Sequence, residues 1–280
     1  MNLYNVLYVV LLGIVEGITE WLPISSTGHL LIIEKIFKDL VDMKIFTDEF
    51  NEMFTVVIQL GAILAVVGIF FRQIWPFTKE EKARKETWSL WKKILIASIP
   101  VALIGLVFDD VIDRLFFNPI TISITLIVYG IIFIIIELTL KNKMDNEKSF
   151  DDINLKTAFL IGISQVLAMI PGTSRSGITI ITGLILLKNR NLSAEFSFLL
   201  SIPVMVGASG LKIVKFLSLQ SFAQPQIIML LIGMLVAYLV SMLVVKWLLK
   251  YLKKKSFKGF AIYRIALGLL IILGIINGFF

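Results

Sequence analysis

Long apolar runs separated by short polar segments dominate the chain. A membrane-spanning helix needs about 20 apolar residues, and shorter runs are tolerated when anchoring residues flank them. The runs cover Met53–Phe71, Ile120–Ile136 (extending to Leu140), Phe196–Leu217, Ile227–Trp247, Ile262–Phe280 and a shorter stretch, Ile94–Phe108. The pattern predicts an all-α polytopic membrane protein with six transmembrane helices, one of them short.

Two further apolar segments are broken in the middle. Leu3–Ile36 is interrupted by "WLPISSTG", and Ala158–Leu187 is interrupted by "MIPGTSRSG". Each segment is too short for two crossings, so each predicts a re-entrant helix–loop–helix pair that enters the membrane and returns to the same side. Irregular backbone at membrane depth is tolerated only where protein or a water-filled cavity covers it.

The polar segments between the runs differ in charge. Basic residues concentrate in Arg72–Lys93, Lys141–Lys156, Lys188–Arg190 and Lys246–Lys258. Such loops are typical of the cytoplasmic side. Acidic residues dominate Asp39–Glu52 and the loop between Phe108 and Ile120, which we expect outside. On this assignment the first broken pair enters from outside and the second enters from the cytoplasm.

The two broken segments also resemble each other. At a constant offset of 149 residues, the matching positions are Gly13 and Gly162, Ile14 and Ile163, Glu16 and Gln165, Ser25 and Ser174, Thr27 and Ser176, and Gly28 and Gly177. Three crossings separate the pairs, and because this number is odd, the two halves point in opposite directions. The sequence predicts one integral membrane domain, residues 1–280, built as an inverted-topology repeat of approximately residues 1–140 and 155–280.

Composition narrows the classes of function. The chain of 280 residues is 58% hydrophobic and only 17% charged, unlike a soluble domain. The basic loops account for its net charge of +7, so we expect a lipid bilayer and no nucleic acid as partner. There is no cysteine, which excludes disulfides and a cysteine nucleophile. Glu16 and Glu20 interrupt the first apolar stretch, so we expect no cleaved signal peptide.

The first broken segment carries most of the polar chemistry. Glu16 and Glu20 are four residues apart and project from one helix face, where they are either functional or solvated at a helix end. Three hydroxyl residues follow: Ser25, Ser26 and Thr27. They are expected to form a turn and an N-cap, and the free amide groups of such a helix start also suit a phosphate. His29, the only histidine, is either structural or catalytic, and its polar neighbours favour catalysis.

The second broken segment contributes a cation. Arg175 lies between Ser174 and Ser176 and needs an anionic partner at membrane depth. That partner is either one of the two glutamates, Glu16 or Glu20, or the phosphate of a substrate, which a guanidinium binds through two hydrogen bonds. Together the two loops offer groups that can hold a divalent cation on oxygen ligands and a diphosphate.

Polar residues elsewhere give weaker signals. Gln59 and Gln165 lie inside apolar runs, where they either line a cavity or form hydrogen bonds between helices. Glu137 is expected near a membrane interface as a solvated charge. Tyr263 and Arg264 are expected to anchor the start of the last crossing.

At "EGITEWLPISSTGHL" and "PGTSRSG" the sequence resembles the BacA-type undecaprenyl-diphosphate phosphatases, the bacitracin-resistance proteins. The resemblance extends in order to "FTVVIQLGAILAV", "FNPIT", "AEFSFLLSIPVMVGA" and "FAIYR". It implies removal of the terminal phosphate of undecaprenyl diphosphate, which regenerates the lipid carrier for peptidoglycan and other envelope polymers. It also implies a divalent cation, Mg²⁺ or Ca²⁺, and an active site open to the external side of the bacterial cytoplasmic membrane.

The motifs of that family fall on the residues of the two loops. Its acidic motif corresponds to Glu16 and Glu20. Its serine–histidine motif corresponds to Ser25, Ser26, Thr27 and His29, and its arginine motif to Ser174, Arg175 and Ser176, with Thr179 just beyond. The resemblance therefore implies that both broken segments build one active site.

We hypothesise that Ser26 attacks the terminal phosphorus, with His29, three residues further on, as base and then acid. Glu16 and Glu20 would hold the cation, or one of them would activate a water. Arg175 would stabilise charge on the transferring phosphoryl group. The residues predicted to bind the substrate phosphate are Ser25, Thr27, Ser174, Ser176 and Thr179.

Two other classes compete with this hypothesis. A transporter or lipid flippase could use the same inverted repeat, although simple ion coordination needs fewer phosphoryl-transfer groups. A phosphatase of the lipid acid phosphatase class is disfavoured, because that site uses two histidines and this chain has one. The sequence leaves the oligomeric state open, with a homodimer as one arrangement.

Overall fold

The computed structural model describes residues 3–42, 44–144 and 147–280, which are helical with connecting loops and contain no strand. The first half contains α1 (Leu3–Thr19), α2 (Ser26–Phe37), α3 (Asp48–Val57), α4 (Gln59–Ile69), α5 (Phe71–Ile74), α6 (Glu81–Phe116) and α7 (Pro119–Leu140). The second half contains η1 (Phe150–Asp152), α8 (Leu155–Gln165), η2 (Val166–Met169), α9 (Arg175–Leu187), α10 (Arg190–Leu219), α11 (Gln224–Leu252) and α12 (Lys258–Ile276), where η denotes a 3₁₀ helix.

Six helical segments of the described chain are long and apolar enough to cross a membrane, as the sequence predicts. They are α3 with α4, α6, α7, α10, α11 and α12. The predicted short crossing, Ile94–Phe108, lies within α6, which runs for 36 residues. Most of the predicted basic loop Arg72–Lys93 is the first part of this helix, since its lysines, arginines and glutamates are strong helix formers. The membrane-compatible part of α6 is therefore only its apolar second portion.

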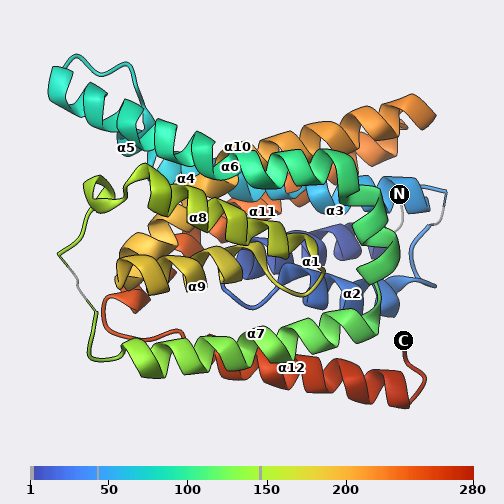
Figure 1. Ribbon diagram of the computed structural model, residues 1–280. Helices are drawn as coiled ribbons and strands as arrows, with labels where there is room; N and C mark the ends of the chain where they lie inside the picture. Colours follow the sequence, from blue (N-terminus) through green and yellow to red (C-terminus); the bar gives the residue numbers. More distant parts are fainter. Residues whose placement is uncertain (1–2, 43, 145–146) are drawn as a thin grey trace.

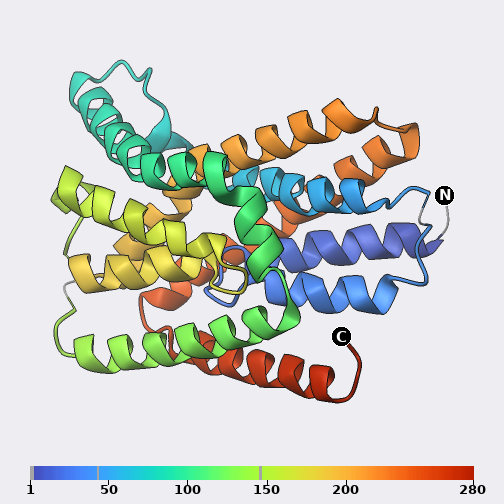
Figure 2. The same cartoon turned by 45° about the vertical axis from the view of Figure 1, so that its right-hand side comes forward.

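The two broken segments form the predicted pairs of short helices, and both reach the middle of the molecule. In Figures 1 and 2, α1 enters from the end that holds both chain termini, and α2 returns to that end. The helices α8 and α9 do the same from the opposite end. The two connecting loops consequently approach each other near the centre.

Both pairs break at a serine with the same unusual backbone. Ser25, which precedes α2, has φ 70° and ψ 109°, and Ser174, which precedes α9, has φ 70° and ψ 116°. A positive φ is unfavourable for a residue with a side chain, so it persists only where the surroundings hold it. These serines are equivalent at the offset of 149 residues, so the internal similarity extends from sequence to backbone geometry.

The first helix of each pair packs against a long helix of the other half. A Cβ added at Gly13 of α1 would lie 2.8 Å from the carbonyl oxygen of Gly233 in α11. A Cβ added at the equivalent Gly162 of α8 would lie 2.1 Å from the carbonyl oxygen of Ala97 in α6. Only glycine allows these approaches. The helices α7 and α12 pack along each other at the lower side of Figure 1 and complete the frame around the loops.

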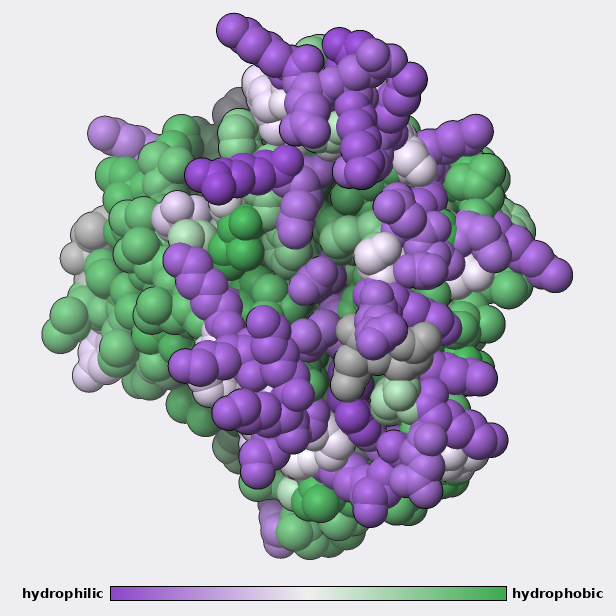
Figure 3. Space-filling model, turned by 90° about the vertical axis from the view of Figure 1, so that its left-hand side faces the viewer, coloured by the Kyte–Doolittle hydropathy of each residue, from purple (hydrophilic) through white to green (hydrophobic). Residues whose placement is uncertain are grey.

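The two ends of the molecule carry different charges. The end at the left of Figure 1 holds the start of α6 and the basic segments around Lys141, Lys188 and Lys253, although residues 145 and 146 lie outside the described part. Hydrophilic residues cover much of this end in Figure 3. The opposite end holds the acidic end of α6. This separation agrees with the charge pattern used to predict the orientation.

The sequence suggests that Glu137 is a solvated charge near a membrane interface, and the structure shows that this expectation is wrong. Its side chain is buried and accepts two hydrogen bonds from Arg190, from Nε at 3.0 Å and Nη2 at 2.6 Å. It also accepts the backbone N–H of Phe257 at 2.9 Å. The ion pair joins the end of α7 to the start of α10, and the hydrogen bond from Phe257 joins it to the start of α12. A local sequence pattern does not reveal these contacts.

Candidate active site

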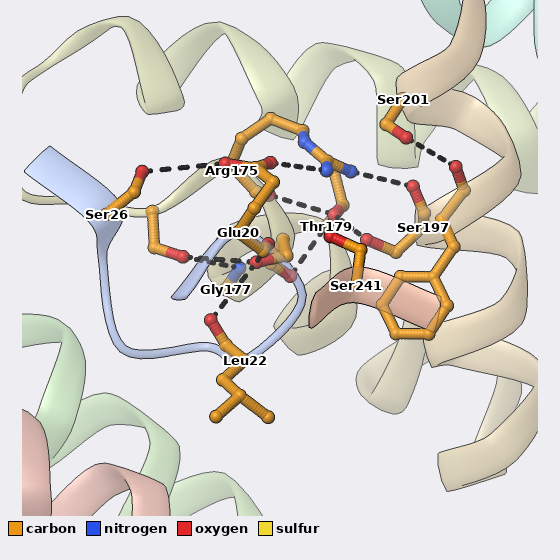
Figure 4. Close-up of polar contacts among 12 residues, drawn as sticks. Glu20, Leu22, Ser26, Arg175, Gly177, Thr179, Ser197, Ser201 and Ser241 are labelled. Atoms are coloured by element: carbon orange, nitrogen blue, oxygen red, sulfur yellow. Dashed lines mark hydrogen bonds and ion pairs between the residues drawn. The ribbon is translucent and has the colours of Figure 1, made fainter. Parts of the chain in front are cut away.

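Hydrogen bonds from a side chain to the backbone join the two central loops. The hydroxyl of Ser176, in the first turn of α9, donates to the carbonyl oxygen of Glu20 at 2.8 Å, and it also lies 3.4 Å from that of Leu22 (Figure 4). Ser176 is buried, so these hydrogen bonds form away from solvent. The loops predicted to build one site therefore do meet, at residues more than 150 positions apart in the chain.

An ion pair crosses the same junction. Nη2 of Arg175 lies 2.7 Å from Oε1 of Glu20, and Nη1 donates to the carbonyl oxygen of Ser197 at 2.8 Å (Figure 4). The guanidinium also lies over the ring of Trp21, 5.9 Å from its centroid. Of the two glutamates that the sequence offers as partners, the structure pairs Arg175 with Glu20.

The second oxygen of Glu20 faces Ser26. The hydroxyl of Ser26 forms a long hydrogen bond to Oε2 of Glu20, at 3.5 Å. One carboxylate therefore serves Arg175 with one oxygen and Ser26 with the other. Long contacts of this kind often shorten once a substrate is bound.

His29 is engaged elsewhere. Its Nδ1 lies 2.7 Å from the carbonyl oxygen of Ser25, and its Nε2 lies 2.8 Å from the hydroxyl of Tyr263 in α12. The two rings are stacked, with an interplanar angle of 7°. Since both ring nitrogens of His29 already have partners in the described structure, the hydrogen bond predicted between Ser26 and His29 does not form. Spacing along α2 allows that contact, but the neighbouring helix α12 offers a better one.

Several predicted phosphate-binding hydroxyls hold the protein together. Ser174 is an N-cap of α9, because its hydroxyl accepts the backbone N–H of Gly177 at 3.1 Å. Thr179 bonds to the backbone of its own helix and lies 2.7 Å from the hydroxyl of Ser197. Thr27 lies half-buried in the first turn of α2. Ser25 occupies the N-cap position of α2, as predicted, but makes no capping hydrogen bond with its side chain.

Other buried polar atoms in this region have no hydrogen-bond partner among the described residues. They are both carboxylate oxygens of Glu16, the hydroxyls of Ser25 and Thr173, Nε of Arg175 and the amide of Gln165. Buried polar groups are rarely left unpaired, so such a group of them indicates a place where a ligand binds. Hydroxyl and guanidinium donors suit an anion, whereas an unpaired carboxylate suits a cation.

A cavity of about 1130 Å³ lies between α2, α3, α4, α6 and α10, beside the second loop. Its inner wall includes Gln59, as the sequence suggests, together with Ser98 and Met169. Charged residues also line the cavity: Glu34, Lys35, Lys38, Asp48, Glu52, Asp109, Asp110, Asp113, Lys212 and Lys215. Glu20, Ser26 and Arg175 are not among its lining residues. An amphiphilic ligand suits a lining that combines apolar and charged side chains.

Three residues that complete the site were not predicted to belong to it: Ser197, Tyr263 and Arg264. Ser197 binds Arg175, and it belongs to a row of buried serines four residues apart in α10 with Ser193 and Ser201. That spacing marks one helix face and could have revealed a polar surface. Tyr263 binds His29. Arg264, expected as an interfacial anchor, is instead completely buried, so that expectation is wrong.

These features define a multi-pass α-helical membrane protein with a buried site of one carboxylate, one guanidinium and several hydroxyls between two broken helix pairs. The chain belongs to the bacitracin resistance protein BacA family, whose sequence model matches residues 9–270. It is 52% identical over 266 residues to the undecaprenyl-diphosphatase of Acetivibrio thermocellus, covering 94% of this chain and 95% of the relative. It is 50% identical over 271 residues to the undecaprenyl-diphosphatase of Enterococcus faecalis, covering 96% of each.

Proposed function

We propose that this protein is an undecaprenyl-diphosphatase that hydrolyses undecaprenyl diphosphate to undecaprenyl phosphate and inorganic phosphate. The reaction recycles the lipid carrier for peptidoglycan and cell-envelope synthesis, and it confers resistance to bacitracin. One observation carries the proposal: Glu20 is hydrogen-bonded to a nucleophile, Ser26, and to a phosphate-binding cation, Arg175, at the junction of the two loops. The names of the relatives support it.

The proposed reaction begins at Ser26. Its oxygen attacks the terminal phosphorus, Oε2 of Glu20 accepts the proton, and the phosphoanhydride bond breaks with undecaprenyl phosphate as leaving group. Water then hydrolyses the phosphoserine and releases inorganic phosphate. Glu20 replaces His29 as the general base, because its carboxylate reaches the Ser26 hydroxyl. We assign His29 to orienting the start of α2 through Ser25 and Tyr263.

Arg175 is proposed to change partners during the reaction. It is paired with Glu20 in the structure, and the phosphoryl oxygens of the substrate would compete for the same guanidinium. Nε of Arg175, which is unpaired in the described structure, supplies a further donor. Stabilising the charge on the transferred group is the main task of such a residue in phosphoryl transfer.

A divalent cation, Mg²⁺ or Ca²⁺, is proposed to bind at Glu16 and Glu20. Support comes from Glu16, whose two buried oxygens lack partners in the described structure. The described residues include no cluster of three acidic or histidine side chains that could hold a metal, so diphosphate oxygens and water would complete its coordination. When bound, the cation would neutralise part of the diphosphate charge.

Removing the cation is expected to stop phosphate release. EDTA should abolish activity, and added Mg²⁺ or Ca²⁺ should restore it. Glu16→Gln should raise the cation concentration needed for half-maximal rate by about tenfold or more, as ligand-shell changes commonly do. Glu86→Gln, on the exposed start of α6, is the control. Full activity in EDTA, or an unchanged cation requirement in Glu16→Gln, would refute the proposed cation site.

The finer topology is also part of the proposal. We propose that α1–α2 and α8–α9 are re-entrant pairs of an inverted-topology repeat. The equivalent backbones of Ser25 and Ser174 and the reciprocal packing at Gly13 and Gly162 support it. We further propose that the basic end faces the cytoplasm, so the cavity opens to the external side of the bacterial cytoplasmic membrane. All the proposed site residues come from one chain, and the homodimer stays a prediction.

Phosphate release by the purified protein tests the proposed function. Detergent-solubilised protein is incubated with undecaprenyl diphosphate and Mg²⁺ or Ca²⁺, and inorganic phosphate and the monophosphate lipid are measured together. We expect both products in equal amounts. No release with any divalent cation would refute the phosphatase. Uptake or transbilayer movement of labelled lipid in proteoliposomes, without hydrolysis, would favour the transporter alternative.

A further inference from the structure

Arg264 is a buried guanidinium without an acidic partner in the described structure. It lies in α12, inside a membrane-spanning segment, and its side chain is 0% exposed. Its Nε has no hydrogen-bond partner among the described residues, and its guanidinium lies 5.8 Å from the ring centroid of Tyr129. A buried charge is costly unless other groups satisfy it, so the contacts of Arg264 need an explanation.

The contacts of Arg264 are backbone carbonyls from both central loops. Nη1 donates to the carbonyl oxygen of Pro23 at 3.3 Å. Nη2 donates to the carbonyl oxygens of Gly172 and Thr173, each at 2.9 Å. Hydrogen bonds from a charged donor are strong in a medium of low dielectric constant. One side chain of α12 thus ties the loop before Ser26 to the loop before Arg175.

The second loop is held from α7 as well. The hydroxyl of Thr125 donates to the carbonyl oxygen of Pro171 at 2.8 Å, beside Gly172 with its φ of 88°. Because α7 and α12 pack along each other, Thr125 and Arg264 belong to one frame of packed helices. Arg264 is the member of this frame that binds both loops.

We propose that Arg264 is a positioning residue for the phosphatase reaction, because its guanidinium sets the distance between the loop that carries Glu20 and Ser26 and the loop that carries Arg175. The proposal rests on the proposed function. Misplacing reacting groups by about 1 Å can lower a rate about a hundredfold without removing any reacting group. Arg264 itself is assigned no contact with the substrate.

Arg264→Lys tests the proposal, since it keeps the charge and loses the fork that binds both loops. We expect kcat for phosphate release to fall by about 10- to 100-fold, with KM changing by less than about threefold. Arg190→Lys is the matched control, because it weakens another buried arginine contact, to Glu137 of α7, that involves neither loop. It should lower the melting temperature but leave kcat within about twofold. Equal kcat losses in the two variants at equal losses of melting temperature would overturn the proposal.

Gly177→Ala is a second test, because it displaces the guanidinium of Arg264 while the residue at position 264 stays arginine. An added Cβ at Gly177 would lie 2.8 Å from Nη1 of Arg264, so that nitrogen must shift, and 3.1 Å from Cβ and Oγ of Ser174, which is a less severe approach. Alanine is a better helix former than glycine, so the local helix α9 does not lose stability through its backbone. We expect kcat to fall in the same direction as in Arg264→Lys. Wild-type kcat in both variants would overturn the proposal.

A measurement without substrate separates this proposal from the proposed function. The chain has no cysteine, so Ile24→Cys in the first loop or Thr173→Cys in the second provides a single thiol at a buried position. Arg264→Lys should raise the rate of maleimide labelling at both positions several-fold, whereas Arg190→Lys should not. If the wild-type protein releases no phosphate, the proposed function is refuted, but the proposal that Arg264 holds the loops is not. An unchanged labelling rate in Arg264→Lys refutes the proposal that Arg264 positions the loops, and it leaves the proposed function standing.

Discussion

Ser26→Ala is expected to lower kcat for phosphate release by about 10⁴-fold or more, because it removes the proposed nucleophile. The change deletes one oxygen that makes a single 3.5 Å contact, to Glu20, so the fold should not depend on it. The melting temperature in detergent should therefore stay within a few degrees of wild type. Rates measured at saturating substrate would separate lost chemistry from lost binding.

A covalent intermediate provides a second readout for Ser26. Acid quenching of the wild-type protein during turnover of substrate labelled in its terminal phosphate should leave label on the peptide that contains Ser26. Ser164→Ala is the matched control, since this half-buried serine of α8 only bonds to the carbonyl oxygen of Ile161. Near-wild-type turnover by Ser26→Ala would rule out the serine as nucleophile and favour direct attack by water.

The parts of this fold that depend on local patterns could be predicted from the sequence. Apolar runs gave the six crossings, and the proline–serine breaks gave both short helix pairs. The need of Arg175 for an anionic partner at membrane depth indicated one of the two glutamates or a substrate phosphate. The choice of Glu20 over Glu16 could not follow, because the sequence predicts both side chains on one helix face, whereas α1 ends at Thr19 and Glu20 lies in the turn beyond it. Only the path of the loop after α1 brings Glu20 to Arg175.

Contacts between distant residues were beyond sequence patterns. His29 binds Tyr263 across 234 positions, which removes the predicted bond to Ser26. Arg264 and Glu137 looked like interfacial charges because arginine and glutamate usually avoid the membrane interior. Arg264 binds loop carbonyls, which depends on how α12 packs. Glu137 binds Arg190, which depends on how α10 packs. A charge inside an apolar run therefore indicated a buried partner more than an interface.

Arg175→Lys should lower kcat/KM by about 10³-fold, although it conserves the positive charge. A lysine presents a single point of charge, whereas the guanidinium reaches Glu20, Ser197 and, in our proposal, the phosphoryl oxygens from one plane. Removing a single charge-stabilising donor from an active site commonly costs about 10²–10³-fold, and arginine in phosphoryl transfer contributes at the upper end or beyond. The loss should appear mainly in kcat, because the transferring group gains charge after binding.

Arg190→Lys distinguishes this effect from a general loss of an arginine–glutamate pair. Both pairs are largely buried and short, at 2.7 Å for Arg175 with Glu20 and 2.6 Å for Arg190 with Glu137. If Arg175 acts only as a structural partner of Glu20, the two variants should lose similar stability and little activity. If it also binds the phosphoryl group, only Arg175→Lys loses activity. A kcat/KM within about threefold of wild type in Arg175→Lys would exclude the proposed role, since a bidentate contact to the reacting group cannot be that weak.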